Sequence, residues 1–285
     1  MSSFGKYTHA IVRRIPATVG QKEQEREKEE EEGSPLDVAK LQRQLGVYAG
    51  ILRQKLGLQV IELPVAEEPG LPHSVCVEDI VVVHGDTALL TRPWDPSRRK
   101  EVETVKNVLK ELKLRVFEVT DEKATLDGSD VFFTGREFFV GISKWTNRKG
   151  AEYVADAFKD FTVSIVHIPE PHHLKSFCSM GGPSTIVIGN SEAARKTVKA
   201  MEELTDYQYD KLSVPDDAAA NCIYARIGNK SNTLVHRTAE EFPESSKAFK
   251  KLPDYMLIPA SCTEVAKLGA ALSSCSILIN KKFEY

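Results

Sequence analysis

The sequence has no excess of basic residues and no long hydrophobic run. Its 285 residues carry 38 Lys and Arg against 41 Asp and Glu, a formal net charge of -3. A protein that binds nucleic acid needs a basic surface, so this balance argues against such a partner. No stretch approaches the ~18 apolar residues that span a bilayer, and the N-terminus has no apolar signal region. We therefore expect a cytoplasmic protein without membrane insertion.

Cysteine is also scarce and scattered along the chain. The five cysteines are odd in number and show no close CxxC spacing: Cys76, Cys178, Cys222, Cys262 and Cys275. This pattern argues against both a disulfide framework and a structural zinc site. Any single cysteine is more often a small buried hydrophobe than a reactive thiol. Composition alone therefore selects no nucleophile.

No segment rich in Pro, Gly and Ser divides the chain, and 41% hydrophobic residues suffice for a full core. We expect one α/β domain over residues 1–285. Residues 21–33 are almost wholly charged and cannot bury themselves. They predict a mobile loop, either a plain surface loop or a lid over a site.

A repeated pattern is present, in which a polar cluster precedes two strands, a helix and a third strand. The clearest copies predict strands at 80–83, 87–91 and 114–119 with a helix at 97–113, then strands at 131–134, 138–142 and 162–168 with a helix at 150–159. Two looser copies predict strands at 173–178, 186–189 and 212–214 with a helix at 191–204, then strands at 222–227, 233–236 and 256–258 with a helix near 245–251. The fifth copy is split between the ends of the chain, with strands at 271–279, 8–12 and 58–63 and a helix at 36–56.

A repeat that joins its two ends predicts a ring, because each unit would otherwise leave a strand edge or an apolar face uncovered. Five units around an axis make a propeller with a central channel. The alternative is an ordinary open α/β sheet, since strand-strand-helix-strand order also occurs there and the period drifts between copies.

Equivalent ends of the repeats converge on the axis of such a ring. Near these ends lie acidic residues, a histidine and a Ser-Cys pair: Glu78, Asp79, Asp127, Asp130, His173, Asp216, Asp217, Ser274 and Cys275. Paired carboxylates suit a guanidinium, whose fork of N–H donors makes bidentate bonds. A histidine and a cysteine beside them would supply a proton shuttle and a nucleophile. Taken singly, each residue could also be an ordinary polar residue at the start of a strand or in a turn.

Several stretches closely resemble the dimethylarginine dimethylaminohydrolase family, from about residue 7 to 282 apart from the charged loop. They are 77–79, 90–93, 97–102, 124–128, 133–141, 173–178 and 278–282. Residues 144–147, 181–183 and 215–220 look most like the second vertebrate isoform of the family. The resemblance implies a five-bladed α/β propeller, the pentein fold, with ββαβ repeats around a central channel. It also implies hydrolysis of Nω-methylated arginines, asymmetric dimethylarginine and monomethylarginine, to citrulline and methylamines, which relieves inhibition of nitric oxide synthase.

The resemblance also implies roles for individual residues. Glu78 and Asp79 hold the guanidinium, Asp127 orients His173, and His173 acts as general acid and then base. Arg98 meets the α-carboxylate of the substrate, and the charged loop 21–33 is the lid. A cysteine thiolate attacks the guanidinium carbon and forms a thiouronium intermediate, with no required cofactor.

The sequence departs from the family pattern at four positions. Active members have an arginine where this chain has Trp145, and aspartates where it has His73 and Gly269. The nucleophilic cysteine aligns with Ser274, and Cys275 follows one residue later. Along a regular strand adjacent side chains point to opposite faces. Either Ser274 faces the channel, or a bulge presents Cys275 as the nucleophile.

Two classes of function follow. The first is a hydrolase with Cys275 as nucleophile, and the second is a binding or regulatory protein that keeps the guanidinium pocket without turnover. Cys275 beside His173 would also form a partial zinc site, at which zinc would inhibit, so no metal is required. Nothing in the sequence identifies a regulatory protein partner.

Overall fold

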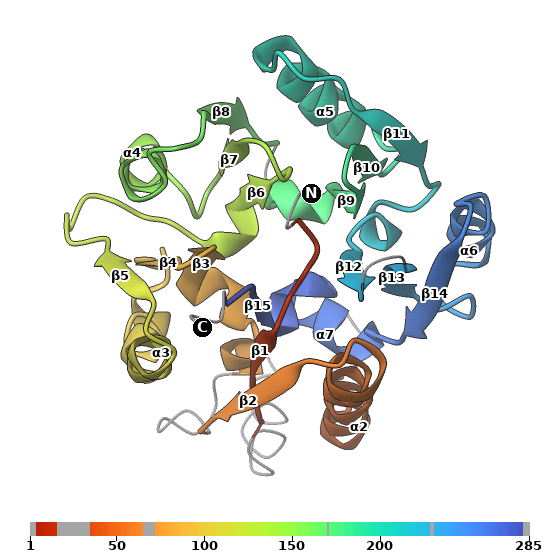
Figure 1. The fold of residues 1–285 in the computed structure, drawn as a ribbon, viewed down its shortest axis with the longest axis horizontal. Helices are drawn as coiled ribbons and strands as arrows, with labels where there is room; N and C mark the ends of the chain where they lie inside the picture. The colour runs from red at the N-terminus through yellow and green to blue at the C-terminus, as the bar shows by residue number, and fades with distance from the viewer. Residues whose placement is uncertain (1–3, 16–34, 65–71, 170, 229–230, 282–285) are drawn as a thin grey trace.

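The computed structural model describes residues 4–15, 35–64, 72–169, 171–228 and 231–281, and the predicted lid at 21–33 lies outside them. These residues form five three-stranded sheets arranged around an axis (Figure 1). The innermost and middle strands of each sheet are antiparallel, and the middle and outer strands are parallel. This is the predicted α/β propeller.

The five sheets, named from the innermost strand outward, have similar short strands. They are β15 (Ile277–Ile279), β1 (His9–Arg13) and β2 (Gln59–Leu63); β3 (Val81–His84), β4 (Thr87–Leu90) and β5 (Arg115–Glu118); β6 (Val131–Phe133), β7 (Phe138–Ile142) and β8 (Val163–His167); β9 (Cys178–Gly182), β10 (Thr185–Ile188) and β11 (Asp210–Ser213); and β12 (Ile223–Ile227), β13 (Ser231–Arg237) and β14 (Tyr255–Ala260).

One helix in each sheet connects the middle strand to the outer strand, because a parallel pair needs a long crossover. These helices are α2 (Val38–Gly50), α3 (Glu101–Glu111), α4 (Arg148–Ala157), α5 (Glu192–Leu204) and α6 (Pro243–Phe249). A sixth helix, α7 (Thr263–Lys267), follows β14. The α2 helix begins at Val38 rather than at residue 36, since the Asp37 side chain accepts from the Lys40 N–H and acts as its N-cap. None of the described helices is both long and apolar enough to cross a membrane.

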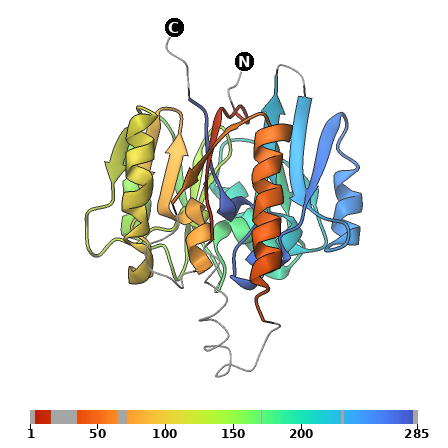
Figure 2. The same ribbon diagram turned by 90° about the horizontal axis from the view of Figure 1, so that it is seen from below.

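The ring closes as the split repeat predicts. The C-terminal β15 pairs antiparallel with β1, with His9 opposite Ile279. The start of β1 and the end of β15 therefore lie at the same end of the channel (Figure 2). Five hydrophobic clusters fill the spaces between the sheets and helices.

A short 3₁₀ turn precedes each innermost strand. The five turns are Val77–Ile80, Gly128–Asp130, Leu174–Ser176, Asp217–Ala219 and Ser273–Cys275. They are the equivalent ends of the repeats, and the 77–80 turn contacts the 273–275 and 128–130 turns, while the 128–130 turn also contacts the 174–176 turn. The turns thus carry the polar residues that the sequence places near the axis.

Two of these turns lie where the sequence predicts strands. Residues 173–178 and 271–279 are not continuous strands, because β9 begins only at Cys178 and β15 only at Ile277. In the first case the His173 and Ser176 side chains cap the turn reciprocally. In the second the Ser274 hydroxyl accepts from the Ala271 N–H at 3.0 Å. These side chain to backbone bonds compete with strand pairing.

Candidate active site

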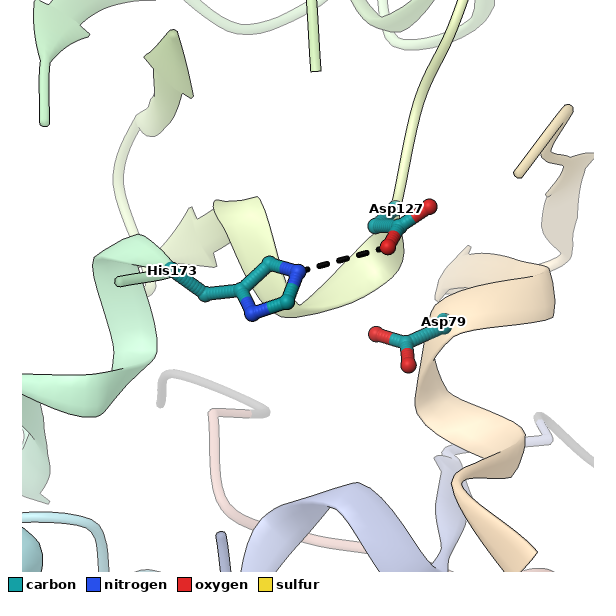
Figure 3. A group of neighbouring side chains, drawn as sticks. All are labelled: Asp79, Asp127 and His173. Atoms are coloured by element: carbon teal, nitrogen blue, oxygen red, sulfur yellow. Dashed lines mark hydrogen bonds and ion pairs between the residues drawn. The ribbon is translucent and has the colours of Figure 1, made fainter. Parts of the chain in front are cut away.

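Asp127 and His173 form a pair at the turn end of the channel (Figure 3). Each is the N-cap of its 3₁₀ turn, so both side chains project from equivalent points of neighbouring repeats. His173 Nε2 lies 3.3 Å from Asp127 Oδ2. The Asp127 N–H donates to the Thr146 hydroxyl, and the Trp94 N–H approaches Asp127 Oδ1 at 3.4 Å. A buried carboxylate therefore holds the imidazole in one orientation.

The pair is charged near neutral pH. Burial lowers the pKa of His173, but the hydrogen bond to Asp127 and the charges of Asp130 and Asp79 outweigh it and raise the pKa to about 9. Burial raises the pKa of Asp127 to about 6, against the influence of His173. At pH 7 the imidazolium can donate a proton and the carboxylate stays ionised.

We expect stability to fall as pH rises from about 6.5 to about 9, by up to ~3 kcal/mol through His173. In this window the folded protein holds a proton that the unfolded chain releases, so ν_N exceeds ν_U and the slope is negative. Urea denaturation at several pH values measures it. His173→Gln should flatten this part of the profile, while exposed His172→Gln should leave it unchanged. Equal slopes in wild type and His173→Gln would contradict the assignment.

Asp79 is the third member of the site (Figure 3). It lies on the 77–80 turn and is 6% exposed. Its Oδ2 accepts from Arg98 Nη1 at 2.7 Å and its Oδ1 from the Ser129 hydroxyl at 2.5 Å. Burial raises the pKa of Asp79, but the charge of Arg98 and that of His173 bring it below its usual value. The carboxylate is therefore held ionised.

Arg98 lies behind Asp79 rather than open to a ligand. The side chain is buried, and its donors bond to Asp79, to Glu101 and to the Cys76 carbonyl. The arrangement anchors Asp79 and already engages four of the five N–H groups of Arg98.

Glu78 borders the channel, and its carboxylate has other main partners than that of Asp79. Its Oε1 accepts from Lys175 Nζ at 2.6 Å, and its Oε2 accepts from the Ser273 hydroxyl at 2.8 Å. Adjacent side chains in a 3₁₀ turn diverge by about 120°, since the turn has ~3 residues. The two carboxylates therefore have different main partners, but the Ser129 hydroxyl contacts both, at 3.5 Å from Glu78 Oε2 and 2.5 Å from Asp79 Oδ1.

The 273–275 turn places its three side chains in different environments. The Ser273 hydroxyl faces Glu78 and Asn221, and the Ser274 hydroxyl accepts from the Ala271 N–H. Cys275 is buried, and it belongs to a hydrophobic cluster with Tyr48, Cys76 and Cys262. Burial, followed by the neighbouring thiols and acidic groups, raises the pKa of Cys275 well above its ordinary value. Neither a pleated strand nor a bulge describes this segment, and the Cys275 thiol is protonated in the core rather than poised as a thiolate.

Trp145 covers one face of His173. The two rings stack with centroids 4.0 Å apart and planes inclined by 17°. Lys144 Nζ lies 4.9 Å from the centroid of the Trp94 ring, so an aromatic and cationic rim surrounds the pair. Such stacking favours the protonated imidazole.

The other sequence-predicted positions lie outside the Asp79, Asp127 and His173 group. His73 is an exposed residue of the 3₁₀ turn Pro72–Val75, and Gly269 follows α7 with a φ of 71°. Asp130 is fully buried and accepts from the Leu174 N–H and the Ser143 hydroxyl. Asp216 and Asp217 accept from Ser245 and the Ser191 N–H. These last three aspartates stabilise the loops.

Three side chains in the described part of the chain could together hold a metal ion. Ligand atoms of Asp79, Asp127 and His173 lie within 4.8 Å of one another, a mixed carboxylate and imidazole set. Cys275 is not in this group, so the zinc site predicted from Cys275 and His173 is not preformed. Arg98 and His173 already compensate the charge of the two carboxylates.

Sequence reasoning missed four polar residues around the site: Ser129, Lys175, Asn221 and Ser273. Lys175 and Ser273 belong to equivalent turns, so the repeat places them near the axis. Nothing in the sequence pairs Lys175 with Glu78, which lies 97 residues earlier.

Comparison with known proteins gives close relatives over nearly the whole chain, although no family model matches it. The human and bovine proteins named "Putative hydrolase DDAH2" are each 50% identical over 281 residues, covering 98% of this chain and 96% of theirs. The N(G),N(G)-dimethylarginine dimethylaminohydrolase of Pseudomonas aeruginosa is 27% identical over 247 residues, covering 86% of this chain and 90% of its own.

Solved structures show the same fold. A cysteine-to-serine variant of the P. aeruginosa dimethylarginine dimethylaminohydrolase, in complex with citrulline, has a TM-score of 0.80 at 21% identity and covers 96% of this chain and 100% of its own. The N-terminal domain of ArgZ, a cyanobacterial arginine dihydrolase, has a TM-score of 0.74 at 14% identity and covers 96% of this chain and 98% of its own.

Proposed function

The chain belongs to the dimethylarginine dimethylaminohydrolase family, and from this premise we propose that it hydrolyses Nω-methylated arginines to citrulline and methylamines. The observation that carries the proposal is the buried Asp127 and His173 pair beside the ionised carboxylate of Asp79. The pair supplies a proton donor, and the carboxylate supplies a partner for a guanidinium.

In this proposal Asp79 and Glu78, whose carboxylates share the Ser129 hydroxyl, bind the guanidinium together. Asp79 already accepts from one guanidinium, that of Arg98, so its geometry suits such a ligand. Arg98 serves to position Asp79, in place of the carboxylate-binding role that the resemblance implies.

Cys275 is the thiol that would attack, because of the five cysteines it is the one on the 273–275 turn, whose Ser273 bonds to Glu78. Its proton would pass to solvent when the turn opens, because His173 is already protonated, and the sulfur would bond to the guanidinium carbon. His173 would then protonate the departing methylamine as the carbon–nitrogen bond breaks. Water, deprotonated by His173, would cleave the thiouronium and release citrulline and the free thiol. Since Cys275 is buried at rest, the 273–275 turn must open first, and we expect slow turnover.

The test is formation of citrulline and dimethylamine in equal amounts from asymmetric dimethylarginine. We expect Asp127→Asn to reduce kcat by at least roughly 100-fold, because His173 loses both its orientation and its proton affinity. Asp216→Asn is the matched control, since Asp216 caps the equivalent turn in another repeat and should leave the rate unchanged. Equal rates for Asp127→Asn and wild type would exclude this role.

The burial of Cys275 favours a second candidate function, which is binding of methylarginines without turnover. Calorimetry separates the two functions. Saturable binding of asymmetric dimethylarginine without citrulline would establish the second, and release of citrulline that Cys275→Ala abolishes would establish the first.

We expect Trp145→Arg to strengthen binding of asymmetric dimethylarginine. An arginine there would offer the charge-assisted bonds to the α-carboxylate that Trp145 cannot donate, worth about 1.5 to 3 kcal/mol or roughly 10- to 150-fold in affinity. Calorimetric Kd values measure this. Trp94→Arg, on the rim of the site, is the control for added charge. An unchanged Kd in Trp145→Arg would mean that the carboxylate binds elsewhere.

The proposed reaction needs no cofactor and takes a small-molecule substrate, whose removal would relieve inhibition of nitric oxide synthase. We place it in the cytoplasm, where thiols stay reduced, and all five cysteines are free and buried.

A further inference from the structure

A cavity of about 360 Å³ runs along the axis of the ring. Residues of all five innermost strands line it, and each of these strands is an edge strand of its sheet. Strand edges carry backbone N–H and C=O groups that need partners. Asp79, Asp127 and His173 are not among the lining residues. The cavity therefore meets the candidate active site at Glu78, Lys175, Asn221 and Ser273 and extends from there along the innermost strands.

The floor of the cavity is polar and electrically balanced. Lys175 and Glu78 pair at 2.6 Å, with side chains 17% and 15% exposed. Asn221 Nδ2 donates to the Lys175 carbonyl and the Ser273 hydroxyl, both at 3.0 Å, and Asn221 Oδ1 accepts from the Ser273 N–H at 2.8 Å. The floor thus offers donors and acceptors without net charge, and it includes the first residue of the turn that carries Cys275.

The opposite end of the cavity is aromatic. Phe4 stacks on Tyr224 with centroids 5.7 Å apart and meets Phe133 edge-on at 6.2 Å. The Gly5 carbonyl accepts from the Arg226 N–H at 2.7 Å, so this segment pairs with the edge of β12. A Cβ on Gly5 would lie 2.5 Å from the Tyr224 ring, which explains the glycine. Residues 4–7 therefore lie across this end.

These features select a class of ligand. The part of the ligand that packs against Phe4, Phe133 and Tyr224 should be flat and aromatic. A charged group would be left without a counter-ion near the floor, because Glu78 and Lys175 neutralise each other. A hydroxyl can donate to Glu78 and accept from Lys175 or Asn221 at the same time. The volume suits a molecule at the small end of the ligand range.

We propose that the axial cavity is a second binding site, for a small neutral aromatic compound with one hydroxyl group, and that its occupancy holds the 273–275 turn closed. The effect on the turn follows from the polar residues at the floor of the cavity. A ligand hydroxyl on Glu78 and Ser273 adds a contact to the residues that clamp the turn, and opening the turn would break it. The proposal does not depend on hydrolysis.

Binding is tested with phenol, titrated into the full-length protein and followed by ligand-observed NMR. We expect saturable binding that Val131→Phe weakens at least about tenfold by filling the cavity from β6. Val163→Phe makes the same change on β8, outside the cavity, and should bind phenol as wild type does. A crystal structure of the wild type with phenol removes any dependence on folding of the variants. Phenol found only outside the axial cavity, or equal affinity in Val131→Phe, would overturn the site.

The coupling is tested by alkylation of Cys275 with iodoacetamide, followed by peptide mass spectrometry. Saturating phenol should slow modification of Cys275 at least about threefold, because alkylation needs the turn to open. Cys178, buried behind the 174–176 turn, should react at an unchanged rate. Ser273→Ala should abolish the protection. An unchanged rate of Cys275 alkylation with phenol bound in the cavity would refute the coupling. It would not affect the binding site or the proposed hydrolysis, which are tested separately.

Discussion

Arg98→Ala is expected to lower the free energy of unfolding by roughly 3 to 5 kcal/mol, because it leaves the buried Asp79 carboxylate without its arginine partner, whereas Glu101 keeps Arg13. Arg98 bonds to Asp79 at 2.7 Å and to Glu101 at 3.2 Å, and all three side chains are less than 10% exposed. Truncating the arginine also removes a donor from the Cys76 carbonyl. Urea denaturation at pH 7 measures the loss.

The pH dependence distinguishes a lost charge pair from a simple packing defect. Arg98 holds the pKa of Asp79 below its usual value, so its contribution is present above the unfolded pKa and is lost as pH falls through the folded pKa. The difference between wild type and Arg98→Ala should therefore shrink in acid, where Asp79 takes up a proton.

Arg115→Ala is the matched control, since Arg115 pairs with Asp86 at 3.0 Å with both side chains more than two-thirds exposed. Such a surface pair contributes about 0 to 1 kcal/mol. Similar losses in the two variants, or a loss in Arg98→Ala that persists in acid, would contradict the account of Asp79.

The architecture could be predicted because the repeat encodes it. The predicted strand 138–142 and helix 191–204 lie within one residue of β7 and α5. The split fifth unit predicted the pairing of the chain ends, which β15 and β1 confirm. The strands could be predicted as short apolar runs, since strands such as β1 and β4 are buried along their whole length.

The turns could not be predicted in the same way. Residues 173–178 and 271–279 are short stretches that suit either a strand or a 3₁₀ turn, and local bonds from Ser176 and Ser274 decide between them. Convergence of Asp127 and His173 followed from the ring alone. The different partners of the two acidic residues, Lys175 for Glu78 and Arg98 for Asp79, depend on turn geometry and on contacts between distant segments.

The turn geometry also decides the sharpest expectation for activity. Of its three side chains, Ser273 is engaged with Glu78 and Asn221, and Cys275 is buried in the core. From the resemblance of the sequence we expect Ser274 to align with the family nucleophile. A hydroxyl is a poor nucleophile without a strong base, whereas a thiol near an imidazolium ionises readily.

We therefore expect Ser274→Cys to raise kcat/KM for citrulline formation from asymmetric dimethylarginine by at least about tenfold, which is ~1.4 kcal/mol of barrier. The gain should persist in Ser274→Cys/Cys275→Ala, because the new thiol would take the place of Cys275 as nucleophile. Ser276→Cys is the control, since the Ser276 hydroxyl bonds to Tyr48 and a thiol there should give no gain. If Ser274→Cys leaves the rate unchanged and Cys275→Ala abolishes it, the resting turn must rearrange to present Cys275. Hydrolysis that survives Cys275→Ala in an otherwise wild-type chain would mean that Cys275 is not the nucleophile and that another group attacks.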